Sequence, residues 1–160
     1  MRIGVISDTH IPRRGRQLPP QVAELFAGVE LILHAGDIND WSVLRELNAI
    51  AWTEAVAGNT DSAAMADILG YRKTLQLCGL QIGLTHGHLG RGRTTPERAW
   101  HTFPQADVVV FGHSHQPYNH VHRGVLLLNP GSATDKRREP KFSVAILTLD
   151  QRPQAEILRF

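Results

Sequence analysis

The sequence predicts an α/β protein in which parallel and antiparallel strands mix and the helices lie outside. Short apolar runs rich in β-branched residues alternate with helical patterns in the first half of the chain, as in successive βα units. Later strand patterns follow one another with few helices between them. Hydrophobic residues make up 42% and charged residues 20% of the 160 residues, a globular composition. No repeat or linker divides the chain, so we expect one domain over residues 1–160.

Three strands, each followed by a helix, are expected in the first half. The strands are predicted at Arg2–Ser7, Leu31–His34 and Ala51–Ala57. The helices are predicted at Pro20–Phe26, at Trp41–Ala49 and from Asp61 to Leu69. Pro20 suits a first helical turn, and Asp40 and Asp61 are the expected N-caps of the second and third helices.

The second half begins with an expected hairpin, in which the strands Arg72–Cys78 and Leu80–Thr85 turn at Gly79. A helix over Pro96–Phe103 follows. The very apolar run Ala106–Phe111 predicts a central strand covered on both faces. The remaining strands are predicted at Tyr118–His122, Val125–Leu128, Phe142–Leu149 and Gln154–Arg159.

Cysteine content and the amino-terminal residues bear on the cellular compartment. The single cysteine, Cys78, excludes an internal disulfide framework and a cysteine-based zinc site, and it fits a reducing compartment. The opening MRIGVISDTH lacks the apolar stretch of a signal peptide, and no apolar run approaches the roughly 20 residues of a membrane span. We therefore expect a cytoplasmic protein without a membrane partner. A net charge of +2 is too small to indicate a nucleic-acid partner.

Polar residues gather where five predicted strands end. Ligands bind outside the carboxyl ends of strands in open α/β sheets, so these residues are expected to share one crevice. The strand ends are Ser7–His10, His34–Asp37, Gly58–Asp61, Thr85–His88 and Gly112–His115.

The residue types at these ends suit a metal centre. Asp8/His10 and His113/His115 are i, i+2 pairs, and in an extended chain each pair faces one way and can aim two ligands at one point. Imidazole and oxygen donors without thiolate suit manganese, iron, nickel or zinc. Adjacent glycines allow close approach of a substrate. The candidates outnumber the ligands of one tetrahedral ion, so two ions sharing a carboxylate fit better. They are Asp8, His10, Asp37, Asn59, His86, His113 and His115.

A single histidine at a strand end is usually a surface or hydrogen-bonded residue, and only the joint pattern favours a metal. His34 lies inside an apolar strand and is interpreted as structural. His88 could support a ligand or face the substrate. His101, His120 and His122 are expected at the surface.

The order D-x-H, G-D, G-N, H-G-H and G-H-x-H, from Asp8 to His115, resembles the calcineurin-like metallophosphoesterase superfamily. The N-P-G-S stretch Asn129–Ser132 and the β-rich tail are similar to its YfcE-type phosphodiesterase subfamily. The resemblance implies a two-sheet αββα sandwich and two divalent ions, with manganese favoured and nickel, iron or zinc compatible. It assigns one ion to Asp8, His10 and His115, the other to Asn59, His86 and His113, with Asp37 bridging.

The activity implied is phosphodiester hydrolysis by a metal-bridging hydroxide. Many superfamily members carry a histidine after the G-N pair, where this chain has Thr60. Eight of the 17 basic residues lie in loops near the site segments, either as solubilising charges or as a rim that attracts anions. The expected substrate-binding residues are Asn59, His88, Arg91 and Arg93.

The sequence is also compatible with two other functions, a scaffold and a nuclease. A retromer subunit of the same fold is a non-catalytic scaffold that resembles these enzymes but lacks some ligands, whereas the complete set here favours an enzyme. A nuclease would need an extended basic groove. The expected partner is a small phosphodiester, with nucleic acid as the alternative, and the chain could form a homo-oligomer.

Overall fold

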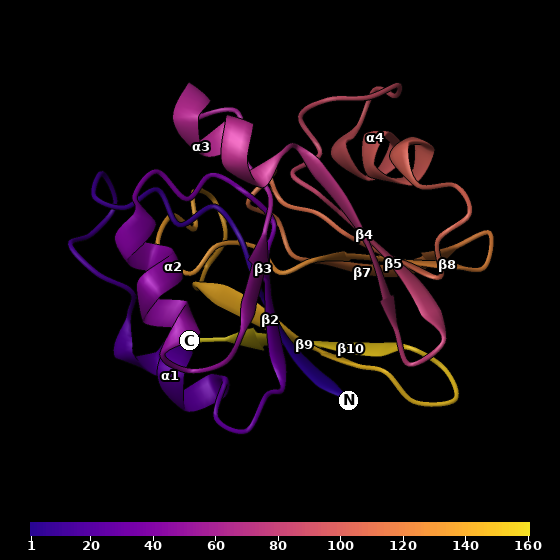
Figure 1. Cartoon of the computed structure of the whole chain (residues 1–160), viewed down its shortest axis with the longest axis horizontal. Helices are drawn as coiled ribbons and strands as arrows, with labels where there is room; N and C mark the ends of the chain where they lie inside the picture. The colour runs from indigo at the N-terminus through magenta and orange to yellow at the C-terminus, as the bar shows by residue number, and fades with distance from the viewer.

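The computed structural model describes all residues from Met1 to Phe160 and arranges the strands in two five-stranded sheets (Figure 1). The first sheet has the order β10-β9-β1-β2-β3, in which β1, β2 and β3 run parallel and β9 and β10 are antiparallel. Its strands are β1 (Arg2–Ile6), β2 (Leu31–His34), β3 (Thr53–Ala55), β9 (Ser143–Thr148) and β10 (Gln154–Arg159).

The second sheet has the order β4-β5-β6-β8-β7. Its middle strands β5, β6 and β8 run parallel, and the outer strands β4 and β7 pair antiparallel with β5 and β8. Its strands are β4 (Arg72–Leu77), β5 (Leu80–Thr85), β6 (Val108–Val110), β7 (Tyr118–His122) and β8 (Val125–Asn129).

Helices cover the outer face of each sheet, so the layers are helix, sheet, sheet, helix (Figure 1). Residues of α1 (Pro20–Leu25), α2 (Trp41–Asn48) and α3 (Ala63–Leu69) pack in one apolar cluster with outward residues of the first sheet. Residues of α4 (Thr95–Thr102) pack with the outer face of the second sheet. The expected αββα sandwich is confirmed.

Strand β6 shows how the sequence builds these layers. Because successive side chains of a strand point to opposite faces, Val108 and Val110 enter the core between the sheets and Val109 packs under α4. All three are fully buried. The prediction of a central strand covered on both faces is confirmed.

Two predicted helix starts differ from the structure. The N-cap of α3 is Ser62, whose hydroxyl accepts a hydrogen bond from the backbone N–H of Met65. Asp61, the expected cap, is directed to other backbone groups instead. Helix α4 starts one residue before Pro96 because Thr94 and Glu97 form a capping box. None of the four helices has the length and hydrophobicity needed to span a lipid bilayer.

Candidate metal centre

The candidate ligands meet because both sheets direct parallel strands to the same end of the molecule. Strands β1, β2 and β3 run parallel in one sheet, and β5 and β6 run parallel in the other, so each sheet brings its carboxyl ends to one edge. The five polar strand ends therefore face one another across the gap between the sheets, as the sequence predicts.

One group of potential ligands comprises Asp8, His10 and His115, all buried. The donor atoms of these three residues lie within 4.8 Å of one another. Nε2 of His10 and Nε2 of His115 are 3.2 Å apart, and Nε2 of His115 lies 3.3 Å from Oδ1 of Asp8. Two imidazole nitrogens and a carboxylate oxygen converging on one point suit a divalent cation.

The second group comprises Asp8, Asp37 and His86, also buried and with donor atoms within 4.8 Å of one another. Asn59 adds a neutral oxygen, since its Oδ1 lies 3.1 Å from Nε2 of His86. The ring of His113 lies 5.1 Å from that of His86, centroid to centroid.

Asp8 belongs to both groups, and one carboxylate oxygen of Asp37 also lies near a histidine of each. Oδ2 of Asp37 lies 3.5 Å from Nε2 of His10 in the first group and 3.4 Å from Nε2 of His86 in the second. Oδ1 of Asp37 accepts a hydrogen bond of 2.9 Å from the backbone N–H of Thr60, which holds the carboxylate in this orientation.

In His10, His86 and His115 the hydrogen bond at the far ring nitrogen shows which atom can bind a cation. Nδ1 of His86 donates to the carbonyl of Ala35 at 2.7 Å, and Nδ1 of His115 donates to the carbonyl of Asp135. Nδ1 of His10 donates to Oδ1 of Asn39 at 3.2 Å. A carbonyl oxygen can only accept, so each Nδ1 carries a proton and each Nε2 has a free lone pair in the neutral ring. This tautomer is the one expected of a metal ligand.

The electrostatics of the cluster favour a cation. Burial alone would lower the pKa of His86, but the hydrogen bond to Asp37 and the charges of Asp8 and Asp37 outweigh burial and raise it. Burial raises the pKa of Asp37, yet His86 and the N–H of Thr60 bring that pKa below its ordinary value. The negative potential that raises the pKa of His86 would equally attract a divalent ion.

His34 is buried close to these residues but does not resemble a ligand. Its Nδ1 accepts a hydrogen bond from the backbone N–H of Gly36, so the proton is on Nε2, which faces the hydroxyl of Thr9. Both nitrogens are thus engaged. Burial, and then the charge of His86, lowers the pKa of His34 to about 3, so the ring stays neutral.

The two i, i+2 pairs do not have the extended backbone that the sequence predicts. Asp8, His10, His113 and His115 all have positive φ angles of 47–68°, so the chain there is left-handed and not extended. Asp8 and His10 still join one group, but His113 lies beside His86 while His115 lies beside His10. The prediction that each pair aims at a single point is therefore wrong for His113/His115.

Glycines beside the candidate ligands make room for ligand side chains. A Cβ atom added at Gly112 would lie 2.7 Å from Oδ2 of Asp8, and one added at Gly58 would overlap Oδ1 of Asp37. Neither glycine has a positive φ angle, so space is the requirement here. Glycine is therefore required at these two positions to leave room for the side chains of Asp8 and Asp37, and not, as predicted, for the approach of a substrate.

Gly112→Ala should push the carboxylate of Asp8 out of both ligand groups, because the added methyl group needs the same space. We expect a loss of about 1–3 kcal/mol in the free energy of unfolding, typical of overpacking, together with reduced metal content. Thermal unfolding and metal analysis of the purified variant test this. Wild-type values for both would contradict the steric argument.

Several residues that hold the ligand-bearing loops in place are not predicted from the sequence. The carboxylate of Asp61 accepts hydrogen bonds of 2.6–3.0 Å from the backbone N–H groups of four residues near the site, namely Asp37, Ile38, Asn39 and Gly58. The hydroxyl of Ser132 donates to the carbonyl of Asp8, and the amide of Asn129 donates to that of Gly112. The N-P-G-S stretch therefore braces two ligand-bearing loops.

The predicted substrate-facing residues have different surroundings. Nδ1 of His88 is buried without a hydrogen-bond partner, and the His88 ring lies 5.2 Å from that of His86. Arg91 and Arg93 are exposed, and their role stays a prediction. The arginine that reaches the site is Arg98 of α4, whose Nε donates to the carbonyl of Gly87 at 2.8 Å.

Comparison with known proteins gives the family. The model of the calcineurin-like phosphoesterase superfamily domain matches residues 1–152. This chain belongs to that superfamily. A probable metallophosphoesterase of Methanothermobacter thermautotrophicus is 41% identical over 161 residues, which cover 99% of this chain and 92% of the relative. Members of the superfamily use divalent metals, and the two ligand groups fit that chemistry.

Other superfamily relatives are of two kinds. A solved structure of an archaeal phosphodiesterase superposes with a TM-score of 0.77 at 25% identity, covering 100% of both chains. Vacuolar protein sorting-associated protein 29 of Schizosaccharomyces pombe is 30% identical over 139 residues, covering 84% of this chain and 73% of the relative. Both an enzyme and a sorting protein therefore resemble the chain.

Proposed function

We propose that this protein is a metal-dependent phosphodiesterase that holds two divalent ions, with manganese favoured. Asp8, His10 and His115 would bind one ion, and Asn59, His86 and His113 the other. The observation that carries this proposal is the position of Asp37, whose Oδ2 faces imidazole nitrogens of both groups at 3.5 and 3.4 Å. A carboxylate between two sets of ligands suits a pair of ions that share it.

The protein's own residues prepare the site for an anionic ester. Bound divalent ions would supply positive charge to the phosphoryl oxygens and make water acidic enough to serve as a nucleophile near neutral pH. The Nδ1 hydrogen bonds of the buried histidines keep each Nε2 aimed inward. Asn59 offers an oxygen without a negative charge, so it does not add to the repulsion of the substrate.

Metal reconstitution tests the proposal directly. Apoprotein would be loaded separately with Mn²⁺, Ni²⁺, Fe²⁺ and Zn²⁺ and assayed against phosphodiesters and phosphomonoesters. We expect two ions per chain and hydrolysis of diesters with at least one metal. A fully loaded protein that hydrolyses no ester would refute the enzyme and favour the scaffold.

Thr60 leads to a further prediction about the leaving group. Its hydroxyl accepts a hydrogen bond of 2.9 Å from Asn39 and lies 3.4 Å from Nδ1 of His10, so it supports His10 and is a very weak acid. General acid catalysis by a placed side chain is typically worth about 10²–10⁴-fold. Without it, rates should fall steeply as the pKa of the leaving group rises, and nitrophenyl diesters should react fastest.

A plot of rate against leaving-group pKa measures this dependence, provided that chemistry limits the rate. A flat plot would contradict the prediction and would point to another proton donor. His88 is the first candidate because its Nδ1 is buried without a partner. In that case His88→Ala should slow the poorest leaving groups most.

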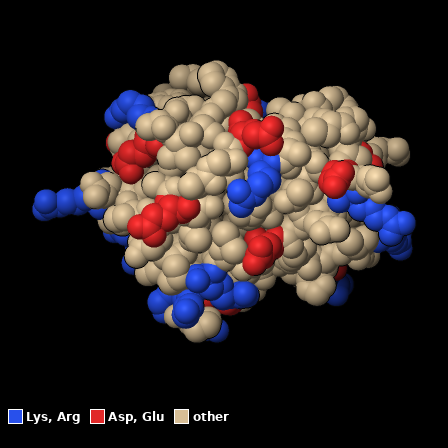
Figure 2. Space-filling model, turned by 90° about the horizontal axis from the view of Figure 1, so that it is seen from below, with Lys and Arg blue, Asp and Glu red and all other residues tan.

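The two alternatives have different support. The sorting-protein relative favours a scaffold, but all seven residues of the predicted ligand set are present in this chain, which favours an enzyme. A nuclease would need a continuous basic track. Figure 2 views the molecule from below: basic side chains gather at the lower left of this face, and acidic and basic groups are interspersed over the rest, so no continuous basic track crosses it.

A further inference from the structure

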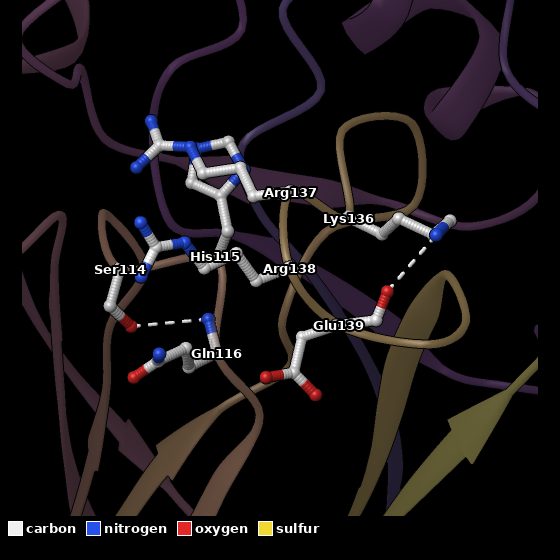
Figure 3. A pocket seen from close by; sticks show the side chains of 7 residues that line it. All are labelled: Ser114, His115, Gln116, Lys136, Arg137, Arg138 and Glu139. Atoms are coloured by element: carbon white, nitrogen blue, oxygen red, sulfur yellow. Dashed lines mark hydrogen bonds between the residues drawn. The ribbon is translucent and has the colours of Figure 1, made fainter.

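A pocket of about 250 Å³ adjoins the candidate metal centre at His115. We call it the cationic pocket. None of its lining residues is hydrophobic, and three basic side chains against one acidic give a formal charge of +2. Its lining comprises Ser114, His115, Gln116, Lys136, Arg137, Arg138 and Glu139 (Figure 3).

Two arginines of this pocket are available to a ligand. In Figure 3 the guanidinium groups of Arg137 and Arg138 extend to the same side, and the carboxylate of Glu139 lies below them. Neither guanidinium takes part in any of the molecule's ion pairs. By contrast, Arg14 is paired with Asp135 at 3.2 Å, and the ammonium of Lys136 donates to the carbonyl of Glu139 at 3.1 Å.

The loop that carries these arginines is tied to a candidate metal ligand. The carbonyl of Asp135 accepts the Nδ1 proton of His115, and the backbone N–H of Asp135 donates to the hydroxyl of Ser132 at 2.8 Å. Burial lowers the pKa of His115, and the positive charge of Arg137 lowers it further, which is consistent with their proximity. The pocket and the metal centre thus share the ring of His115.

We propose that the cationic pocket is a subsite for a second phosphate of the substrate, carried on the group esterified to the scissile phosphate. This inference rests on the proposed function and narrows its substrate class to diesters with an additional anionic group. Two unpaired guanidinium groups suit phosphate oxygens, which they bind through charge-assisted hydrogen bonds. The small volume and the acidic Glu139 favour one terminal phosphate of a small molecule over a polymer backbone.

Matched substrates test the subsite. The compounds are 4-nitrophenyl phosphodiesters of alkanediols in a graded series of chain lengths, each with either a free hydroxyl or a phosphate at the far end. The leaving group is the same throughout, so only the second phosphate differs. At the chain length that spans the two sites we expect kcat/KM to be about tenfold higher for the phosphorylated compound. Added salt should reduce this preference.

The double variant Arg137→Ala/Arg138→Ala should lose the preference and keep its rate on the hydroxyl compounds. Arg152→Ala/Arg159→Ala removes two exposed arginines elsewhere and should leave the preference intact. Calorimetric titration with the matching alkanediol bisphosphate gives a readout without turnover, and its Kd should rise about tenfold only in the pocket variant. Metal content should equal that of the wild type in both.

The outcomes separate the two proposals. A rate ratio near one at every chain length, or a preference and a Kd unaltered in the pocket variant, would overturn the subsite while leaving the phosphodiesterase intact. No hydrolysis of any compound by metal-loaded protein would instead refute the proposed function, and the substrate subsite with it.

Discussion

Asp37→Ala should bind fewer than two metal ions per chain and lose nearly all phosphodiesterase activity. Its Oδ2 is the oxygen that faces both ligand groups, so its removal weakens both sites and leaves the repulsion between two cations less screened. Residues that only orient ligands typically contribute about 10–100-fold, and we expect a larger loss here. Metal analysis beside a nitrophenyl diester assay measures the effect.

Asp37→Asn separates charge from packing. An asparagine can still accept the hydrogen bond from the N–H of Thr60, so this variant should fold like the wild type yet bind metal poorly. Asp150→Ala removes an exposed carboxylate and should leave both readouts unchanged. A fully loaded and fully active Asp37→Ala protein would rule out a shared carboxylate.

Asp61→Ala should have the largest effect on stability among the residues around the site. It would leave four backbone N–H groups without their carboxylate, three of them in consecutive residues that begin at Asp37. Hydrogen bonds to a charged group are worth more than neutral ones, so we expect a loss on the order of 3 kcal/mol. At this chain length that corresponds to a fall of about 6–12 °C in Tm.

A graded variant series sharpens this prediction. Each oxygen of Asp61 accepts two of the four hydrogen bonds, so Asp61→Asn, which retains one acceptor oxygen, should lie between the wild type and Asp61→Ala. Asp67→Ala, an exposed position on α3, is the matched control. Metal content should fall in the same order as Tm, because the loop that holds Asp37 loosens. An unchanged Tm in Asp61→Ala would show that Asp61 does not support that loop.

The sequence by itself predicts the fold class and most of the elements. An apolar run such as Val108–Val110 indicates a buried strand. The side chains of a strand point to alternate faces because of local backbone geometry alone, so this feature is predictable from sequence. The sequence also indicates the gathering of polar residues, since parallel strands bring their carboxyl ends to one edge. His34 could be set aside as structural on its position within an apolar strand, and its two hydrogen bonds agree.

The division of the ligands into two groups depends on tertiary structure. His113 and His115 are two residues apart, yet left-handed φ angles of 68° and 61° direct them to different neighbours. Such angles are rare for residues other than glycine and have no sequence signal here. The partners of Asp61 depend on tertiary structure as well. A carboxylate before a helix is a common N-cap, but three of the four backbone N–H groups that Asp61 accepts from lie more than 20 residues away.

The cationic pocket also depends on which strands are neighbours. Arg137 and Arg138 follow β8, and they reach His115 because β8 pairs with β6 in the second sheet. The sequence shows that these arginines follow a turn, but it does not show which loop lies beside them. Residue types and periodicity are local properties that a chain carries in its sequence. The pairing order of strands and the contacts between their loops arise only when the two sheets pack together.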